Sequence, residues 1–425
     1  MPYRFVHTAD LHLDSPLRSL SLRDVALADR VALATREAFA NLVQAALEES
    51  VDAVMIAGDL FDGTQTSRKS SLFLSGELRR LHAAGIDVFI VKGNHDARSK
   101  VTAGIDLPPN VHVFDGRGGA GRVARAGDRP VVVHGVSFRE AHASDSLLPR
   151  YARPAEGAIE IGLMNTSLAG AAGHDPYAPC ALADLVGHGF AYWGLGHVHG
   201  RTVHHDGGDC AVVMPGMPQG RDVGERGAMS ASLVTIADDG TVVLDTIPTS
   251  LVVFERVEAC VPPGADWDEA LHAAETALVD AAETAGAARE MVARLRLTGQ
   301  TPTHWRLRRD ADAFRDELGE RLGGGVHVEK VAVDVVAPSA IAAPDTPIRE
   351  LARDMREAAG ATAFRAEATD LMDEVIRSLP KAARDLAFPP DEREAMLAAL
   401  CEEGVADIAA RIEGTGARDG GSSAP

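Results

Sequence analysis

The sequence predicts an α/β fold with a second sheet behind the first, followed by a small α+β module and C-terminal helices. Three observations support this. Short apolar runs alternate with amphipathic helix-length stretches at the start of the chain, short strands dominate from residue 111 onward, and a new strand-helix series begins near residue 250. Alternating strands and helices are typical of layered α/β domains. We expect domains at residues 1–250, 251–337 and 338–425.

The first sheet is expected from a β-α-β-α-β series. Residues 3–8, 53–57 and 88–91 are apolar runs of strand length. Between them, residues 24–49 and 67–84 carry apolar side chains at helical spacing. This order indicates parallel strands connected by helices.

The second sheet is expected from five later segments. In the last of them, Asp239-Gly240 marks a hairpin turn between two alternating runs. The segments are VHVF, VVVHGVSF, AIEIGLMN, AYWGLGH and SASLVTIADDGTVVLDTI.

The module after residue 250 is predicted from the segments VVFERVEACV, MVARLRLTG and VHVEKVAVDVV as strands, with helices at about 267–285 and 312–322. A Pro/Ala linker, APSAIAAPDTP, then precedes two amphipathic helical stretches, and the tail GTGARDGGSSAP has the composition of a disordered end. The stretches carry Ile348, Leu351, Leu371, Val375, Ile376 and Leu379, and Met396, Leu397, Leu400, Val405 and Ile408.

Charge and composition restrict the function. The chain has 425 residues and a net charge of −20, from 42 Lys and Arg against 62 Asp and Glu, which disfavours a protein that coats nucleic acid. An enzyme acting on phosphates remains compatible, because bound metal ions dominate the charge of a site. The four cysteines lack CxxC spacing, which argues against disulfides and thiolate zinc. No apolar run reaches the roughly 18 residues of a spanning helix, so we expect a cytoplasmic protein without a membrane partner.

Five short polar motifs follow predicted strands. Residues two apart in extended backbone point the same way, and a glycine lets the chain turn sharply at the carboxyl edge of a sheet, where α/β folds build sites. His, Asp and Asn without Cys suit Mn, Fe or Zn, and the set could hold two metals. The motifs are Asp10-Leu11-His12, Gly58-Asp59-Leu60-Phe61-Asp62, Gly93-Asn94-His95-Asp96, Gly162-Leu163-Met164-Asn165-Thr166 and Gly196-His197-Val198-His199.

Each motif alone also has an ordinary structural explanation. A single Asp is more often a helix cap or turn former, a single His is usually a packed or surface residue, and GNH alone is a common turn. Taken singly, each has at best roughly a one-in-ten chance of being a metal site. Four such motifs in this order should arise by chance in well below about 1% of sequences, so we interpret them together as one site.

The order DxH, GDxxD, GNHD, GHxH resembles the calcineurin-like metallophosphoesterase superfamily. The opening HTADLHLDSP and the segment PGMPQGRDVGERG are similar to its SbcD/YhaO-type DNA repair exonuclease branch. The resemblance covers about residues 1–250. It implies a four-layer sandwich of two mixed sheets flanked by helices, and a site for two divalent metal ions, of which Mn²⁺ is the expected ion. By this resemblance, Asp10, His12 and His199 hold the first metal, and Asp59 bridges both.

The second metal is implied to bind Asn94 and His197. One position departs from the family: Asn165 stands where that branch carries a histidine ligand. An amide oxygen is a weaker donor than imidazole to Mn or Zn, so a weak second site is expected.

The resemblance also implies a proton donor. His95 would protonate the leaving oxygen, with Asp96 orienting its ring. Asp62 is expected to support the site without ligating metal.

The implied function is a metal-dependent DNA nuclease in repair, with DNA and a separate SMC-like ABC ATPase of SbcC type as partners, because the chain has no Walker A motif. The C-terminal helices either dock on that ATPase or pack only on their own domain, and a homodimer is also left open. Two other functions remain: a phosphodiesterase or phosphatase for a non-DNA substrate, and a catalytically weakened subunit that binds DNA ends or the ATPase.

Overall fold

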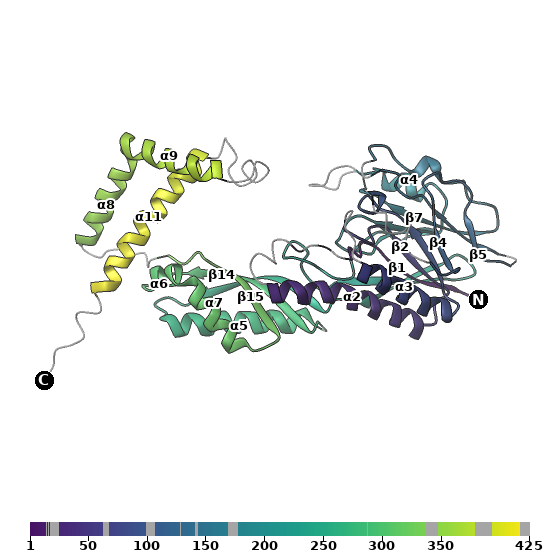
Figure 1. Cartoon of the computed structure of the whole chain (residues 1–425), viewed down its shortest axis with the longest axis horizontal. Coiled ribbons are helices and arrows are strands. Elements are labelled where there is room, and N and C mark those ends of the chain that lie inside the picture. The colour runs from purple at the N-terminus through teal and green to yellow at the C-terminus, as the bar shows by residue number, and fades with distance from the viewer. Residues whose placement is uncertain are drawn as a thin grey trace. The chain divides into compact units, whose positions relative to one another are not determined.

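The computed structural model describes residues 1–13, 15, 17, 25–62, 68–98, 107–127, 129–140, 143–168, 177–286, 288–336, 347–378 and 393–416. The chain forms two compact units. The first comprises Met1–Arg256, Ala281–Ala293 and Gly324–Glu329, and the second comprises Val257–Asp280, Arg294–Gly323 and Lys330–Pro425. Figure 1 labels helices and strands of both units.

The first six-stranded sheet has the order β12-β11-β1-β2-β3-β4. Its strands are β1 (Tyr3–Thr8), β2 (Ala53–Ala57), β3 (Asp87–Val91), β4 (Val111–Val113), β11 (Ser230–Ile236) and β12 (Val242–Pro248). Strands β1 to β4 are parallel, with Val6 opposite Val54 and Ile56 opposite Ile90. Two segments predicted for the second sheet belong to this one. Residues Val111–Val113 pair parallel with β3, and the predicted hairpin joins through β11, which pairs antiparallel with β1.

The second six-stranded sheet has the order β5-β6-β7-β8-β10-β9. Its strands are β5 (Arg122–Arg125), β6 (Val131–Gly135), β7 (Ile159–Asn165), β8 (Tyr192–Gly196), β9 (Thr202–His205) and β10 (Ala211–Met214). Three of these, β5, β9 and β10, were not predicted. Strands β5 and β9 are short edge strands whose residues are exposed or half-buried, so they lack the apolar pattern by which buried strands are recognised.

Helices cover the outer faces of the two sheets (Figure 1). Helices α2 (Val25–Glu48) and α3 (Arg68–Ala83) pack apolar side chains such as Phe39 and Leu78 against Val54 and Ile56. Helix α4 (Leu182–Val186) packs on the other sheet. Between the sheets, the core contains Phe5, Met55, Phe89, Ile161 and Tyr192. The predicted four-layer sandwich is confirmed.

The third sheet has three strands in the order β13-β14-β15. These are β13 (Val252–Val261), β14 (Glu290–Gly299) and β15 (Val326–Val333), connected through α5 (Trp267–Ala285), α6 (His304–Arg309) and α7 (Ala311–Leu322). Trp267 joins two of the helices, because its ring lies 5.2 Å from that of Phe314 and its Nε1 donates to Glu317 at 2.8 Å. All of these elements except the short α6 were predicted.

The C-terminal segment contains α8 (Pro347–Gly360), α9 (Thr362–Ser378) and α11 (Arg393–Gly416). The first predicted helical stretch is thus two helices that separate at Ala361, and Leu379 lies outside the described residues. Arg356 of α8 reaches Glu402 of α11 at 2.7 Å. The tail was expected to be disordered from residue 414, but α11 runs to Gly416, and residues 417–425 lie outside the described part.

Two short 3-10 helices, η1 (Asp96–Arg98) and η3 (Leu148–Arg150), lie in loops of the first unit. Over the described ranges, no helix is long and apolar enough to cross a membrane. The domain boundaries at residues 250 and 337 stay a prediction.

Candidate metal centre

The predicted ligands lie at the carboxyl ends of parallel strands. Asp10 and His12 follow β1, Asp59 follows β2, and Asn165 is the last residue of β7. Backbone hydrogen bonds tie the first two loops together, because the N–H of Asp10 donates to Gly58 at 3.0 Å and that of His12 donates to Asp59 at 2.9 Å. Asn165 pairs with Gly196 at the end of β8, just before His197. The two sheets therefore bring segments far apart in sequence to one edge.

The backbone at this edge is strained. Among the described non-glycine residues with positive φ are Asp10 (54°), His12 (43°), Asp59 (52°) and His197 (105°). Such conformations cost of order 1–3 kcal/mol each and persist where the surrounding structure enforces them, typically at functional sites. Four of the predicted metal ligands share this property.

Two glycines let the loops approach closely. A Cβ atom on Gly93 would overlap the carboxylate of Asp59, and one on Gly58 would lie 2.5 Å from Nδ2 of Asn165. Any other residue at these positions would displace a candidate ligand. The glycines of the GDLFD and GNHD motifs are thus required by the packing of the site.

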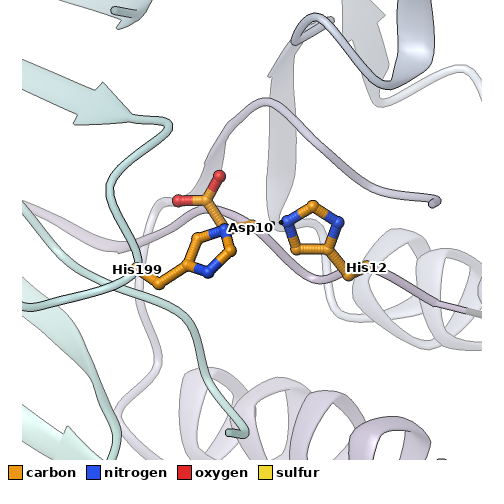
Figure 2. A group of neighbouring side chains, drawn as sticks. All are labelled: Asp10, His12 and His199. Atoms are coloured by element: carbon orange, nitrogen blue, oxygen red, sulfur yellow. Dashed lines mark hydrogen bonds between the residues drawn. The ribbon is translucent and has the colours of Figure 1, made fainter. Parts of the chain in front are cut away.

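Asp10, His12 and His199 converge from two loops on one point (Figure 2). One ligand atom from each lies within 4.8 Å of the others. Nε2 of His12 and Nε2 of His199 are 3.1 Å apart. The Asp10 carboxylate accepts two 3.1 Å hydrogen bonds from the backbone N–H of His197. These three residues, predicted to hold the first metal, form a compact cluster.

The remaining candidates lie beside this cluster. Oδ1 of Asn94 is 3.3 Å from Nδ1 of His197, so the two residues predicted for the second metal are neighbours. Asp59 accepts a hydrogen bond of 3.0 Å from the backbone N–H of His95. Asn94, His197, His199 and Asp59 all line one cleft of about 810 Å³.

Asn165 has an unused acceptor. Its side chain is fully buried, and its Nδ2 donates to the carbonyl of Ala57 at 3.1 Å. Its Oδ1 is buried without a hydrogen-bond partner among the described residues. Leaving such an acceptor unpaired costs about 1–3 kcal/mol, so the position is suited to a cation.

The electrostatics also fit divalent cations. Burial first, and then the charge of Asp59, raise the pKa of Asp10 to about 8. Burial likewise raises the pKa of Asp59, and it lowers the pKa of His12, which favours the neutral imidazole that ligates metals. Two buried carboxylates and neutral imidazoles form a donor set that a divalent ion would stabilise.

His95 is oriented by Asp62, not by Asp96 as expected. Nδ1 of His95 lies 2.9 Å from Oδ1 of Asp62, and this hydrogen bond is the main cause of the raised pKa of His95. The carboxylate of Asp96 instead accepts the backbone N–H groups of Leu60, Phe61 and Gly93 at 3.1 to 3.2 Å. The residue next in sequence to His95 thus stabilises the loops, because η1 turns its side chain into the protein.

Sequence reasoning missed two residues of the site. Oε1 of Glu225 lies 2.6 Å from Nδ1 of His199. Arg221 pairs with Glu225, with Nη2 2.6 Å from Oε1. Burial raises the pKa of Glu225, but hydrogen bonds from His199 and Arg221 outweigh it and hold the pKa at about 2. Both residues lie in PGMPQGRDVGERG, where an Arg and a Glu four positions apart were the available signal.

The same cleft offers further groups to a substrate. Its lining includes Tyr177, whose ring lies 4.9 Å from that of His197, and the exposed Arg226. These residues place an aromatic face and a positive charge beside the candidate ligands. Such groups suit a phosphate ester that carries an aromatic ring, such as a nucleobase.

Comparison with known proteins agrees with this geometry. The family model of the calcineurin-like phosphoesterases matches residues 3–201. A second model, the middle domain of metallophosphoesterase YhaO, matches residues 254–336.

Individual relatives cover the same region. The chain is 35% identical over 238 residues to the uncharacterized metallophosphoesterase YhaO of Bacillus subtilis, covering 55% of this chain and 57% of that protein. It is 27% identical over 221 residues to the DNA double-strand break repair protein Mre11 of Sulfurisphaera tokodaii, covering 51% and 54%. The Mre11 protein of Thermoplasma acidophilum is 28% identical over 201 residues, covering 46% and 51%. The chain thus spans about half the length of the relatives it matches.

A crystal structure of a dimetal phosphatase from Danio rerio matches with a TM-score of 0.34 and 13% identity, covering 58% of this chain and 98% of that one. That score is too low to add to the assignment. The assignment rests on the two family models, together with the order of the motifs DxH, GDxxD, GNHD and GHxH in this chain. Residues 3–201 thus belong to the calcineurin-like metallophosphoesterase family, and residues 254–336, which follow them, match a YhaO-type middle domain.

Proposed function

We propose that this phosphoester hydrolase is a DNA nuclease that depends on two divalent metal ions, with Mn²⁺ as the expected ion. The proposal is carried by the cluster of Asp10, His12 and His199, because His199 lines the same cleft as Asp59 and the proposed proton donor His95. Asp10, His12 and His199 would hold one ion, and Asp59 would be shared.

The second ion would be held by Asn94, His197 and Asn165. The free Oδ1 of Asn165 supports this role, because it is a buried oxygen donor without another partner in the described chain. When bound, two such ions supply the charge neutralisation and water activation that phosphoester hydrolysis needs.

The side chains of the cleft would do the rest of the chemistry. The Asp62 carboxylate orients the His95 ring and favours its protonated form, so His95 can deliver a proton to the leaving oxygen. Arg226 would bind a backbone phosphate, and Tyr177 would stack on a base.

DNA is the proposed substrate because two of the relatives are named as DNA double-strand break repair proteins. The partner we propose is a separate SMC-like ABC ATPase, docked on the C-terminal helices in the cytoplasm. Helix α9 supports docking, because Phe364, Leu371 and Val375 are 47%, 60% and 54% exposed and fall near one face at a spacing of seven and four.

The deciding experiment measures hydrolysis by the purified full chain. Single- and double-stranded DNA, a bis-nitrophenyl phosphodiester and a nitrophenyl phosphomonoester would each be assayed with Mn²⁺, Mg²⁺, Zn²⁺ and chelator. Asp59→Asn serves as the inactive site variant. Arg153→Met, an exposed residue outside the cleft lining, serves as the control.

We expect Mn-dependent release of nucleotides that Asp59→Asn abolishes and Arg153→Met preserves. Cleavage of the small esters with DNA left intact would instead identify a phosphodiesterase or phosphatase for another substrate. Binding of DNA ends without hydrolysis of any ester would identify a weakened binding subunit. Either result would overturn the nuclease assignment.

A further inference from the structure

We propose that Arg221 is a positioning residue that connects the candidate metal ligand His199 to the candidate proton donor His95. One guanidinium group contacts the carboxylate behind each of these histidines. The inference rests on the proposed metal-dependent hydrolysis. In it, Arg221, which lies outside the cleft lining, positions both His199 for metal binding and His95 for proton donation.

The first contact is with Glu225. Nη2 of Arg221 lies 2.6 Å from Oε1 of Glu225, and Nε lies 3.2 Å from Oε2, which is the fork geometry of a strong Arg–carboxylate pair. The backbone N–H of Arg221 also donates to Oε2 at 2.8 Å. These contacts fix the Glu225 carboxylate, and its Oε1 forms a hydrogen bond of 2.6 Å with Nδ1 of His199.

This contact sets the chemistry of His199. A carboxylate on Nδ1 fixes the ring so that its Nε2 faces Asp10 and His12, as observed. Loss of such supporting carboxylates typically costs about 10- to 100-fold in metal affinity. Arg221 therefore acts on the first metal position through Glu225.

The second contact is with Asp62. Nη1 of Arg221 lies 3.4 Å from Oδ2 of Asp62 and 3.4 Å from Oγ of Ser15, and Ser15 donates to the same Oδ2 at 3.0 Å. The other oxygen, Oδ1, lies 2.9 Å from Nδ1 of His95. One oxygen of Asp62 thus contacts Arg221 and Ser15, and the other contacts His95.

The network is largely shielded from water. The side chains of Arg221, Glu225 and Asp62 are 14%, 12% and 23% exposed. Removal of the guanidinium would leave two carboxylates without their shared counter-charge, and uncompensated charges at this depth are costly. Both carboxylates would then move, and with them His199 and His95.

Arg221 is not placed to bind substrate itself. The described lining of the cleft includes Glu225 and Arg226 but not Arg221. A substrate-binding arginine would change KM, whereas a positioning arginine behind the ligands would change metal affinity and kcat. This difference makes the role measurable.

The experiment compares Arg221→Met, Arg221→Lys, Glu225→Gln and Asp62→Asn in the full chain, with Arg153→Met as the charge-matched control. The Mn²⁺ dissociation constant would be measured by electron paramagnetic resonance of the free ion, independently of activity. The kcat and KM on DNA would be measured at saturating Mn²⁺, and thermal melting of the metal-free proteins would report folding.

We expect Glu225→Gln to weaken Mn²⁺ binding by about 10- to 100-fold, and Asp62→Asn to lower kcat by about 10-fold or more while Mn²⁺ affinity stays within about 3-fold. Arg221→Met should do both. Arg221→Lys should restore each only in part, because an ammonium lacks the fork. Combining Arg221→Met with Glu225→Gln should weaken Mn²⁺ binding little beyond the single variants, since both act through one path.

Arg221→Met with Mn²⁺ affinity and kcat equal to those of the control would overturn the proposal, and so would a rise in KM alone. Full recovery by lysine would reduce the role to simple charge and would also reject it. If the protein hydrolyses no ester, yet Arg221→Met still weakens Mn²⁺ binding, the proposed function fails while the connection to His199 stands.

Discussion

Oδ1 of Asp62 lies 2.9 Å from Nδ1 of His95, while both oxygens of Asp96 accept backbone N–H groups. Two carboxylates near one histidine therefore have different tasks. Asp62 orients the ring that faces the cleft, and Asp96 holds the loops after β2 and β3 together. Substitutions at the three positions should give three different results.

Replacement of His95 by alanine should leave the metal content unchanged and lower turnover by about 10²- to 10⁴-fold, the usual contribution of a general acid. Metal would be counted per chain by mass spectrometry, alongside kcat on DNA. Loss of both metals in His95→Ala would show that His95 is a ligand.

Asp96→Asn should instead lower the melting temperature, because three backbone N–H groups lose a charged acceptor.

Asn165→His should raise Mn²⁺ content and nuclease rate when Mn²⁺ is limiting, with little change at saturation. An imidazole nitrogen is a better donor than the free amide Oδ1, and ligand changes commonly alter affinity by about 10- to 100-fold. The check is a titration of activity and bound metal against Mn²⁺ for both proteins. Identical curves would show that asparagine is an adequate ligand, and an inactive variant would show that the pocket around Gly58 has adapted to it.

Arg226→Met should weaken DNA binding without changing kcat. Arg226 is exposed on the lining of the cleft, so its charge can meet a phosphate. The slope of log K against log salt should become shallower by about 0.7 to 0.9, the value for one phosphate contact. An unchanged slope would place Arg226 away from the bound strand. Arg153→Met, exposed and outside the cleft, is the control.

His7 should make the fold sensitive to mild acid. It is fully buried, with Nδ1 2.8 Å from the Tyr192 hydroxyl and Nε2 3.1 Å from the Leu195 carbonyl, so the neutral ring satisfies both nitrogens. Burial lowers the pKa of His7 to about 3, against about 6.5 in an unfolded chain. Below pH 6.5 the unfolded chain binds a proton that the folded one rejects, so stability present above that pH is lost as the pH falls toward 3.

The expected loss from His7 is about 2 kcal/mol at pH 5 relative to pH 8, from the linkage of the two pKa values. Urea unfolding of the metal-free protein at both pH values would measure it. His7→Gln should be less stable at pH 8 but should lose about 2 kcal/mol less on acidification. Equal losses in the two proteins would refute this role of His7.

Truncation after residue 337 should leave Mn²⁺ binding and hydrolysis intact while abolishing binding of an ABC ATPase. The deleted helices α8, α9 and α11 contact one another, as the Arg356–Glu402 pair illustrates. In the full chain, Leu371→Glu should weaken the same binding, whereas Leu72→Glu, an equally exposed leucine on α3, should not. Co-purification of the ATPase with the truncated chain would exclude these helices as the docking site.

Much of the first unit was predictable because its signals are local. An apolar run followed by glycine and a polar ligand, as in Ala53–Ala57 before Asp59, identifies both a buried strand and its functional end. The edge strand Arg122–Arg125 carries no such signal, because its residues are exposed or only half-buried. The hairpin was predicted as a unit, but the sheet it joins depends on which edge is open, and that is a property of the assembled fold.

By itself, the sequence determined which side chains form the candidate centre, since Asp10, His12, Asp59 and His199 are identified by their spacing beside strands. Only the tertiary structure decided which side chains form hydrogen bonds to these residues and position them. His199 and Glu225 are 26 residues apart, and Arg221 and Asp62 are 159 apart, so no local pattern connects them. The sequence also placed Asp96 beside His95, but the Asp96 side chain accepts hydrogen bonds from backbone N–H groups, and His95 pairs with Asp62 instead. Strand ends are fixed by local periodicity, whereas pairing of buried charges is fixed by which loops the packed sheets bring within hydrogen-bond distance.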